Sequence, residues 1–447
     1  FSSRRRHTRL LTQSRGLGDV YKRQIQEDAD GIAVSSYQGG HNEFFRYMVD
    51  RLRELGAGHI KVFGGGGGTI TPEEIEALMD YGVERIYHPH DGMEMGLGAM
   101  IEDLVSRTVE GRQATMAPES SAMDVEIAAM ISAIEEGVFD DDQLAALRKE
   151  WQIRSGKVPV IGITGTGGAG KSSVTDEILN RFLANFPESR IAVLAVDPTR
   201  RRTGGALLGD RIRMNTLRSD QIYMRSIATR RQHLATSEML GDHIAFLKSC
   251  GFDVVIVETA GIGQSDSEIV DMVDFSVYVM TSDYGAASQL EKIDMLDFAD
   301  LVVLNKYDKR GAEDALRDIR KQWQRNHVSF DTPDDEIPVY PTIASQFNDP
   351  GISWMFAQLC RRVVDKVGLD AAAWTPGIDD ATREPRATAT IPGKRIRYLA
   401  EIAEQGRTIN ARVEAQADIA SRAQHVYESL KLLEDPELPA ELDPYAS

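Results

Sequence analysis

Cysteine is scarce in this sequence, and long apolar runs and a net positive charge are absent. Only Cys250 and Cys360 occur in 447 residues, so no disulfide framework or cysteine-rich metal site is available. No apolar run reaches the roughly 18–20 residues that span a bilayer, which argues against a membrane-spanning protein. A net charge of −18 disfavours broad nucleic-acid binding, because phosphate contacts need clustered Lys and Arg. We therefore expect a cytoplasmic protein, and its length predicts about two to four domains.

The first 24 residues differ in composition from the rest of the chain. They hold six Arg and one Lys against a single acid, Asp19. No apolar core accompanies these basic residues, so the segment is not a signal peptide. One interpretation is a basic nucleic-acid-binding arm. We expect instead that residues 1–24 are a non-native leader joined at a broken reading frame, and we predict the fold without them.

Residues 25–110 alternate short apolar runs with amphipathic helices, which predicts a parallel α/β sheet. The strands are expected at 31–34, 60–63 and 85–87, with a helix over about 41–55, a second helix capped by Thr71, and a loop over 88–92. Ligands of such sheets bind beyond the carboxyl ends of the strands. Ser35 and Ser36 follow the first strand, and Gly64 and Gly65 follow the second, where glycine lets a ligand approach the backbone.

The spacing of these residues resembles the cobalamin-binding domain of B12-dependent mutases. The 26 residues 38–63 separate Ser35-Ser36-Tyr37 from Gly64-Gly65, and Tyr37 replaces the usual Leu of that family. The resemblance implies a partial flavodoxin-like domain with Ser35, Ser36, Gly64 and Gly65 as cofactor-binding residues. The family's Asp-x-His-x-x-Gly loop, whose His ligates cobalt, has no counterpart here. We expect His7, His41, His59, His88 and His90 to be surface or loop residues.

A helical connector over 111–154 leads into a phosphate-binding motif. The apolar strand 158–164 runs into Gly165-Thr-Gly167-Gly168-Ala169-Gly170-Lys171-Ser172-Ser173, followed by a helical pattern to Phe186. Glycines allow successive N–H groups to point at phosphate oxygens, and the helix N-terminus adds its dipole. Lys171 is expected to reach the β- and γ-phosphates, and the Ser172 hydroxyl to ligate Mg²⁺. The alternative is a Gly-rich turn with a chance Lys-Ser, which the flanking strand and helix disfavour.

A second motif selects the base. The apolar strand 301–304 ends in Asn305-Lys306-Tyr307-Asp308, about 135 residues beyond the first motif. The Asp308 carboxylate can accept two hydrogen bonds from guanine, which adenine cannot supply, so GTP is favoured over ATP. Lys306 would lie along the base plane and Asn305 would brace the loop. Ala344 follows another strand and is a candidate to donate its backbone N–H to guanine O6.

Two acids at strand ends are candidates for the metal site. Asp197 ends the strand 191–196, and Glu258 ends the strand 252–257 at the position of the Walker-B acid. We expect these carboxylates to hold Mg²⁺ or its water shell; the alternative for both is an N-cap or a solvated turn. Gln264 is a candidate to position the attacking water.

The whole set of motifs resembles the GTPase chaperones of B12-dependent acyl-CoA mutases. The segment 229–237 is similar to the form fused inside isobutyryl-CoA mutase, in which a cobalamin domain, a GTPase, a linker and an acyl-CoA barrel follow one another. The resemblance implies Mg²⁺ contacts from Ser172, Val196 (through its carbonyl), Asp197, Asp210, Glu258 and Thr259, with Arg213 on the nucleotide. It also implies a further switch over 284–292, with Gln289 and Lys292 as its polar residues.

We accordingly expect an α/β chain with a P-loop GTPase domain over 155–365 and a linker and helical segment over 366–447. The resemblance implies a fragment of a mutase that isomerises isobutyryl-CoA and butyryl-CoA with adenosylcobalamin, in which GTP hydrolysis gates cofactor loading and release. The mutase barrel would be the partner, in cis or as a separate subunit, and the parent would be a homodimer. The alternatives are a free-standing chaperone of the MeaB or ArgK type, acting on a methylmalonyl-CoA-type mutase, and a non-enzymatic cobalamin carrier.

Overall fold

The computed structural model describes most of the chain, with gaps. The described residues are 10–11, 20–36, 39–65, 68–109, 124–198, 211, 214–229, 233–259, 268–284, 290, 293–378, 385 and 398–438. They divide into two compact units, Phe1–Arg386 and Ala387–Ser447.

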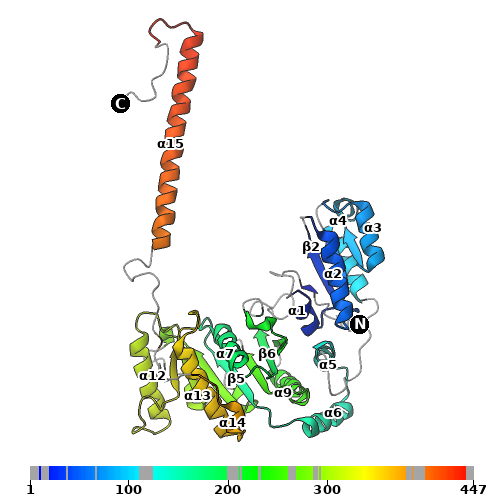
Figure 1. The fold of residues 1–447 in the computed structure, drawn as a ribbon, viewed down its shortest axis with the longest axis vertical. Coiled ribbons are helices and arrows are strands. Elements are labelled where there is room, and N and C mark those ends of the chain that lie inside the picture. The colour runs from blue at the N-terminus through cyan, green and yellow to red at the C-terminus, as the bar shows by residue number, and fades with distance from the viewer. Residues whose placement is uncertain are drawn as a thin grey trace. The chain divides into compact units, whose positions relative to one another are not determined.

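A four-stranded parallel sheet forms the N-terminal part of the first unit (Figure 1, blue to cyan). Its strands lie in chain order. Its strands are β1 (Leu10–Leu11), β2 (Gly31–Ser35), β3 (Lys61–Gly65) and β4 (Arg85–Tyr87). Its helices are α1 (Val20–Gln26), α2 (His41–Glu54), α3 (Pro72–Tyr81) and α4 (Pro89–Val109). Phe45, Leu52 and Val62 belong to the core between these elements. Strands β2 to β4 lie where the apolar runs predicted them.

Local capping explains two features of this part. Thr71 caps α3 as expected. Its hydroxyl accepts from Glu74 N at 3.3 Å, and Thr71 N donates to the Glu74 carboxylate. The expected loop over 88–92 is wrong, because α4 begins at Pro89. Pro89 suits the first helical position, and the Asp91 carboxylate accepts from His88 N at 2.8 Å, which is the hydrogen bond of a helix start.

His41 also departs from the sequence expectation. It was expected at the surface or in a loop, but it is the first residue of α2 and only 8% exposed. Its Nε2 lies 3.1 Å from Glu74 Oε2, so it links the starts of α2 and α3. His59 and His90 are exposed, His88 is partly buried, and His7 lies outside the described residues.

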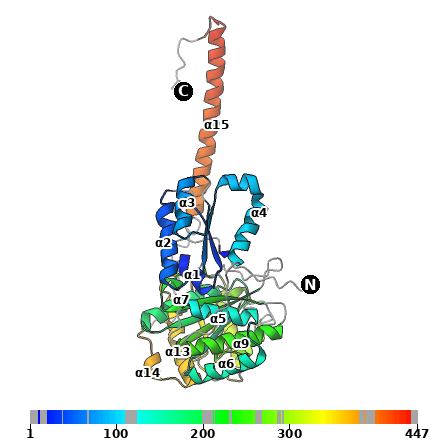
Figure 2. The same ribbon diagram turned by 90° about the vertical axis from the view of Figure 1, so that its right-hand side faces the viewer.

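A seven-stranded parallel sheet with helices beside it forms the larger part of the unit (Figure 2). Its strands lie in the order β11-β10-β9-β5-β8-β6-β7. Its strands are β5 (Val160–Gly165), β6 (Ile191–Pro198), β7 (Ile222–Thr229), β8 (Val254–Thr259), β9 (Phe275–Met280), β10 (Leu301–Asn305) and β11 (Val339–Thr342). The order reverses direction at β5, which places a ligand crevice at the carboxyl end of that strand.

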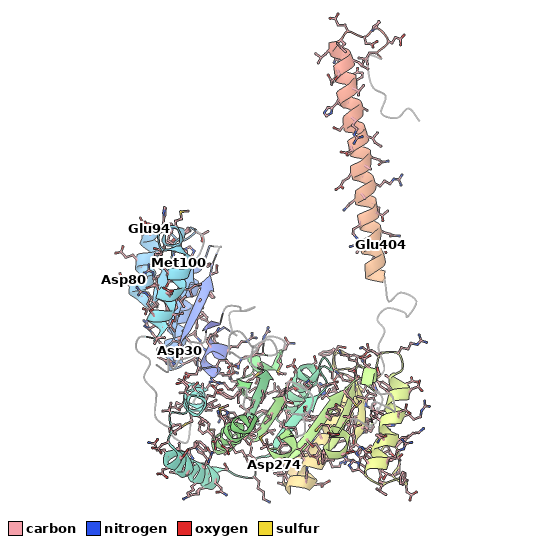
Figure 3. The ribbon with its side chains drawn as sticks, turned by 180° about the vertical axis from the view of Figure 1, so that it is seen from behind. Asp30, Asp80, Glu94, Met100, Asp274 and Glu404 are labelled. Carbon is pink, nitrogen blue, oxygen red and sulfur yellow. The ribbon has the colours of Figure 1, made fainter. Side chains whose placement is uncertain are left out.

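Alternation along the strands gives this sheet two apolar faces. Ile161 and Ile163 of β5 pack with α7 (Lys171–Asn185) and α13 (Pro350–Val367) on one face. Val160 packs on the other face with α5, α6 and α9. The remaining helices are α5 (Asp124–Glu136), α6 (Asp141–Arg154), α9 (His233–Ser249), α11 (Met295–Phe298), α12 (Ala312–Asn326) and α14 (Ala371–Trp374). Asp274, labelled in Figure 3, ties β9 to β5 because its Oδ2 accepts from Val160 N at 2.8 Å.

The second unit contains one long helix, α15 (Tyr398–Leu432), close to the predicted helical segment. Its described side chains are mostly exposed, Ile409 and Val413 included, and they project all around the helix (Figure 3). None of the described helices is long and apolar enough to cross a membrane. The α/β class, the parallel sheets and the helical C-terminal region are as predicted.

Candidate nucleotide-binding site

The turn between β5 and α7 has a backbone that only glycine fits at two positions. Gly165 has φ 149°, and a Cβ there would lie 1.9 Å from Val279 O of the neighbouring strand. Gly170 has φ 91° and precedes the first residue of α7; a Cβ there would lie 2.6 Å from Asn305 Nδ2. The predicted phosphate-binding residues, from Gly165 through Gly167, Gly168 and Ala169 to Ser173, therefore form a tight strand-to-helix turn.

Lys171 lies inside this turn. It is 8% exposed, and its Nζ donates to Gly165 O at 3.0 Å and to Thr166 O at 3.2 Å. A buried ammonium at the N-terminus of a helix adds its charge to the inward N–H groups of the turn. The arrangement suits a polyphosphate.

Ser172 and Glu258 lie together beside the turn. The Ser172 hydroxyl donates to Glu258 Oε1 at 2.7 Å, and Glu258 is 5% exposed at the end of β8. The next residue, Thr259, donates its hydroxyl to Thr164 Oγ1 at 2.8 Å, and it is paired in register with Val196 of β6. These are hard oxygen donors, which Mg²⁺ prefers, so the residues present fit that ion. In the described part of the chain no three His, Cys, Asp or Glu side chains form a cluster able to hold a metal alone.

Asn305 joins the phosphate turn to the loop after β11. It is 2% exposed, and its Nδ2 donates to Ala169 O at 2.8 Å. Its Oδ1 accepts from Thr342 Oγ1 at 3.3 Å and from Ala344 N at 3.1 Å. The bracing role expected of Asn305 agrees with this geometry. The Ala344 N–H therefore lies beside Asn305 in the loop after β11, and its expected role toward guanine O6 stays a prediction.

Lys306 and Asp308 follow at the carboxyl end of β10. Lys306 has φ 59°, and its Nζ donates to Gly168 O at 2.7 Å. The Asp308 side chain is exposed. The base-selecting motif and the phosphate turn are thus in direct contact through Lys306 and Asn305.

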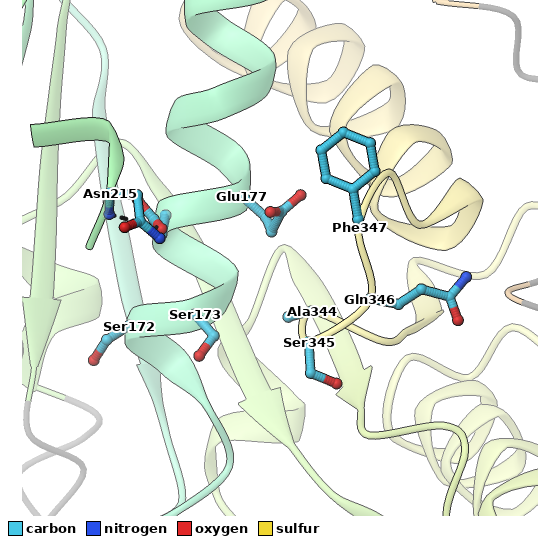
Figure 4. A pocket seen from close by; sticks show the side chains of 9 residues that line it. Ser172, Ser173, Glu177, Asn215, Ala344, Ser345, Gln346 and Phe347 are labelled. Carbon is cyan, nitrogen blue, oxygen red and sulfur yellow. Dashed lines mark hydrogen bonds between the residues drawn. The ribbon is translucent and has the colours of Figure 1, made fainter. Parts of the chain in front are cut away.

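A pocket opens between α7 and the loop after β11 (Figure 4). It is lined by Ser172, Ser173, Asp176, Glu177, Asn215, Ala344, Ser345, Gln346 and Phe347. Glu177 on α7 and Phe347 on the loop face each other across it. The pocket therefore extends from the predicted phosphate site along the loop that follows β11.

Comparison with known proteins agrees with this geometry. Residues 127–376, more than half of the chain, match the family described as methylmalonyl Co-A mutase-associated GTPase MeaB. The chain belongs to the MeaB GTPase family. Proteins named fused isobutyryl-CoA mutase are similar over nearly all of it: that of Geobacillus kaustophilus is 47% identical over 92% of this chain, and that of Cupriavidus metallidurans 46% over 93%. The chain spans 38% of the length of each. A solved LAO/AO transport system kinase aligns with a TM-score of 0.40 and 20% identity, over 70% of this chain and 89% of that one.

Two acids that support the site of this GTPase were missed from the sequence. Asp176 on α7 accepts from Asn215 N at 3.1 Å and from Thr216 N at 3.0 Å, which fixes the segment before β7 beside the pocket. Asp349 is fully buried, and its Oδ2 accepts from Ile343 N at 3.0 Å and Ile352 N at 2.9 Å, so it shapes the loop over 343–349. Burial raises the pKa of Asp349, and these two N–H donors oppose the shift. Asp349-Pro350 is a helix-start signal that could have indicated this residue.

Several predicted residues of this GTPase cannot be placed. The side chain of Asp197 lies outside the described residues, as do Asp210, Arg213, Gln264, Gln289 and Lys292 in full. Their expected roles stay predictions.

The four predicted cofactor-binding residues lie at neighbouring strand ends of the smaller sheet. Ser35 is paired in register with Gly65, and Ser36 N donates to Gly65 O at 2.8 Å. Gly64 has a packing reason, because a Cβ there would lie 2.7 Å from Phe45 Cζ in the core. At Gly65 the nearest atom to such a Cβ is Tyr87 O at 3.7 Å, an ordinary contact, so packing does not explain this glycine and its expected role stays a prediction.

Proposed function

We propose that this chain binds GTP with Mg²⁺ and hydrolyses it at the turn between β5 and α7. The observation that carries the proposal is that the Asn305 side chain bonds to two segments at once. It contacts Ala169 O of the phosphate turn at 2.8 Å and Ala344 N of the loop after β11 at 3.1 Å. Recognition of the base and of the phosphates is thereby built into one rigid arrangement, as nucleotide hydrolysis by positioning requires.

Each residue of the site has a distinct role in this proposal. Lys171 offsets the negative charge that spreads over the transferring phosphoryl group. Ser172 and Glu258 hold Mg²⁺ with Val196, Asp197, Asp210 and Thr259, and the ion neutralises phosphate charge when bound. Asp308 accepts from the guanine edge, Lys306 lies along the base, and the Ala344 N–H donates to guanine O6. Gln264 orients water and Arg213 contacts the nucleotide.

The activity that this hydrolysis serves is proposed from the relatives' names and from the residues of the smaller sheet. We propose that GTP hydrolysis gates loading and release of adenosylcobalamin for an acyl-CoA mutase that interconverts isobutyryl-CoA and butyryl-CoA. Ser35, Ser36 and Gly65 would contact the cofactor at the strand ends. A second candidate is a chaperone for a separate methylmalonyl-CoA-type mutase, which the family description favours.

Calorimetric titration of the purified chain with GDP, ADP and their triphosphates in Mg²⁺ tests the proposed site. We expect the guanine nucleotides to bind at least about tenfold more tightly, because adenine leaves the Asp308 acceptor unpaired. The rate of phosphate release from GTP should depend on the Mg²⁺ concentration. Equal affinity for the adenine and guanine nucleotides would contradict the proposal.

A further inference from the structure

Strand β7 is the edge of the seven-stranded sheet, and side chains cover its free backbone groups. Gln26 Nε2 donates to Ile222 O at 3.1 Å, and Gln26 Oε1 accepts from Met224 N at 3.4 Å. Glu27 Oε1 accepts from Ser226 N at 3.1 Å. Alternate residues of an edge strand present such groups to whatever lies beside the sheet. Here Gln26 and Glu27, at the end of α1, take the place of a neighbouring strand.

Arg211 completes this covering. Its Nη1 donates to Met224 O at 2.6 Å and to Glu27 Oε1 at 2.8 Å, and its Nη2 donates to Gln26 Oε1. Arg211 is 2% exposed and Glu27 3% exposed, so the ion pair is almost fully dehydrated. Burial lowers the pKa of Arg211, and Glu27 opposes that shift. Arg225, on the other side of Glu27, contacts Glu135 Oε2 at 3.2 Å and supplies a second cation.

Arg211 precedes by four and five residues two backbone groups that are held beside the nucleotide pocket, those of Asn215 and Thr216. Met214 is buried in the core that includes α7. Asn215 N and Thr216 N donate to Asp176 of α7, and both Asn215 and Asp176 line the pocket. Arg211 is therefore held by Glu27, and Asn215 and Thr216 are held by Asp176 of α7, five residues after Lys171.

We propose that Arg211 is a positioning residue of the nucleotide site, and that Glu27 holds it there. Through this pair, the smaller sheet's helix α1 sets where the chain beside the pocket lies, so the N-terminal part and nucleotide affinity are coupled. Breaking the pair releases the segment before β7 and weakens nucleotide binding. Coupling of this kind is reciprocal, so bound nucleotide must in turn stabilise the contacts of α1 with β7. The inference rests on the proposed GTP site and adds to it the residues through which the two parts communicate.

Two variants test whether the Glu27–Arg211 pair affects nucleotide affinity. Glu27→Gln keeps the side-chain shape and removes the charge opposite Arg211. Arg148→Gln is the control for loss of an ion pair elsewhere, because Arg148, which is half exposed, pairs with Asp242 at 2.5 Å between α6 and α9. We expect Glu27→Gln to raise the GDP dissociation constant about tenfold at 20 °C and Arg148→Gln to leave it within about twofold. The melting temperature of each variant is measured as well. If the Glu27–Arg211 pair were purely structural, Glu27→Gln would lower the melting temperature and leave the dissociation constant unchanged.

Hydrogen exchange in the unaltered chain provides a second test, which does not depend on the folding of any variant. GDP should slow exchange of the Met224 and Ser226 amides, while amides of α6 should keep their rates. Two results would overturn this inference while leaving the proposed GTP site intact. One is protection of the phosphate turn by GDP without any change at Met224 and Ser226, and the other is an unchanged GDP dissociation constant in folded Glu27→Gln. If the unaltered chain binds no guanine nucleotide, the proposed function fails, and this inference fails with it.

Discussion

The Ser172 hydroxyl lies 2.7 Å from the Glu258 carboxylate, and this bond joins the first turn of α7 to the end of β8. Glu258 lies at the carboxyl end of β8, and Ser172 follows the turn that leaves the carboxyl end of β5, which pairs with β8 in register from Val160 to Ile163. The sheet therefore fixes the separation of two oxygen donors before any ligand arrives. Such preorganisation lets a site stabilise charge without rearrangement during the reaction.

The first prediction concerns charge at the phosphate turn. Lys171→Ala should lower GTP turnover by at least about a hundredfold, because it removes the buried cation that offsets developing phosphoryl charge. Lys157→Ala is the matched control, since Lys157 is an exposed lysine bonded to Gly368 O at 3.2 Å. Phosphate release under saturating GTP measures both. Turnover of Lys171→Ala at the level of the control would show that the turn is not catalytic.

Glu258→Gln should change the dependence of turnover on Mg²⁺. The amide keeps the size of the side chain and can still bond to Ser172, but it loses the negative charge that attracts the ion. We expect the Mg²⁺ concentration for half-maximal turnover to rise about tenfold or more, which a titration at fixed GTP measures. An unchanged midpoint would place the metal elsewhere.

Base selection gives the third prediction. Asp308→Asn exchanges an acceptor for a group that can donate, so guanine loses its paired edge and xanthine, with an added carbonyl, gains a partner. GDP should bind at least about tenfold more weakly and xanthosine diphosphate more tightly than in the unaltered chain. Competition titration against a fluorescent GDP analogue reports both constants. Retained preference for GDP in this variant would remove Asp308 from the base site.

Backbone shape at the turn is tested by two glycine substitutions. Gly170→Ala adds a Cβ 2.6 Å from Asn305 Nδ2 at φ 91°, whereas a Cβ at Gly167 meets nothing within 4 Å. A left-handed non-glycine residue costs about 1–3 kcal/mol, and the clash moves the side chain that joins the two loops. Gly170→Ala should weaken GDP binding and lower the melting temperature, and Gly167→Ala should keep the melting temperature. Equal behaviour of the two variants would contradict the packing argument.

The sequence predicted the phosphate and base motifs because each is contiguous and follows an apolar strand. Asn305 and Lys171 could be assigned roles from neighbours within a few residues. The contacts of Asp176 with Thr216 and of Glu27 with Arg211 join residues far apart in the chain, so no local sequence pattern predicts them. Strand β7 was missed for a related reason: Arg225 interrupts its apolar run, and its charge is acceptable only because Glu135 and Glu27 lie beside it. Packing gives Gly64 a second reason to be glycine, because a Cβ there would lie 2.7 Å from Phe45 Cζ, and only the packed core reveals it.

The last prediction concerns pH and a histidine outside the site. His243 on α9 is fully buried, and burial lowers its pKa to about 4, with Glu135, Arg225 and Asp242 as its charged neighbours. An unfolded histidine has a pKa of about 6.5, so between those values the unfolded chain binds the proton and the folded chain does not. The stability that depends on neutral His243 is therefore complete above about pH 6.5 and is lost as the pH falls toward 4. The expected loss at pH 5 is about 2 kcal/mol. Urea unfolding at pH 7.5 and pH 5 measures it, and His243→Leu should lose less between those pH values than the unaltered chain or the exposed-site control His425→Gln. If the urea midpoint of His243→Leu falls between pH 7.5 and pH 5 as far as that of the unaltered chain, other groups cause the acid sensitivity, because Leu has no proton to gain.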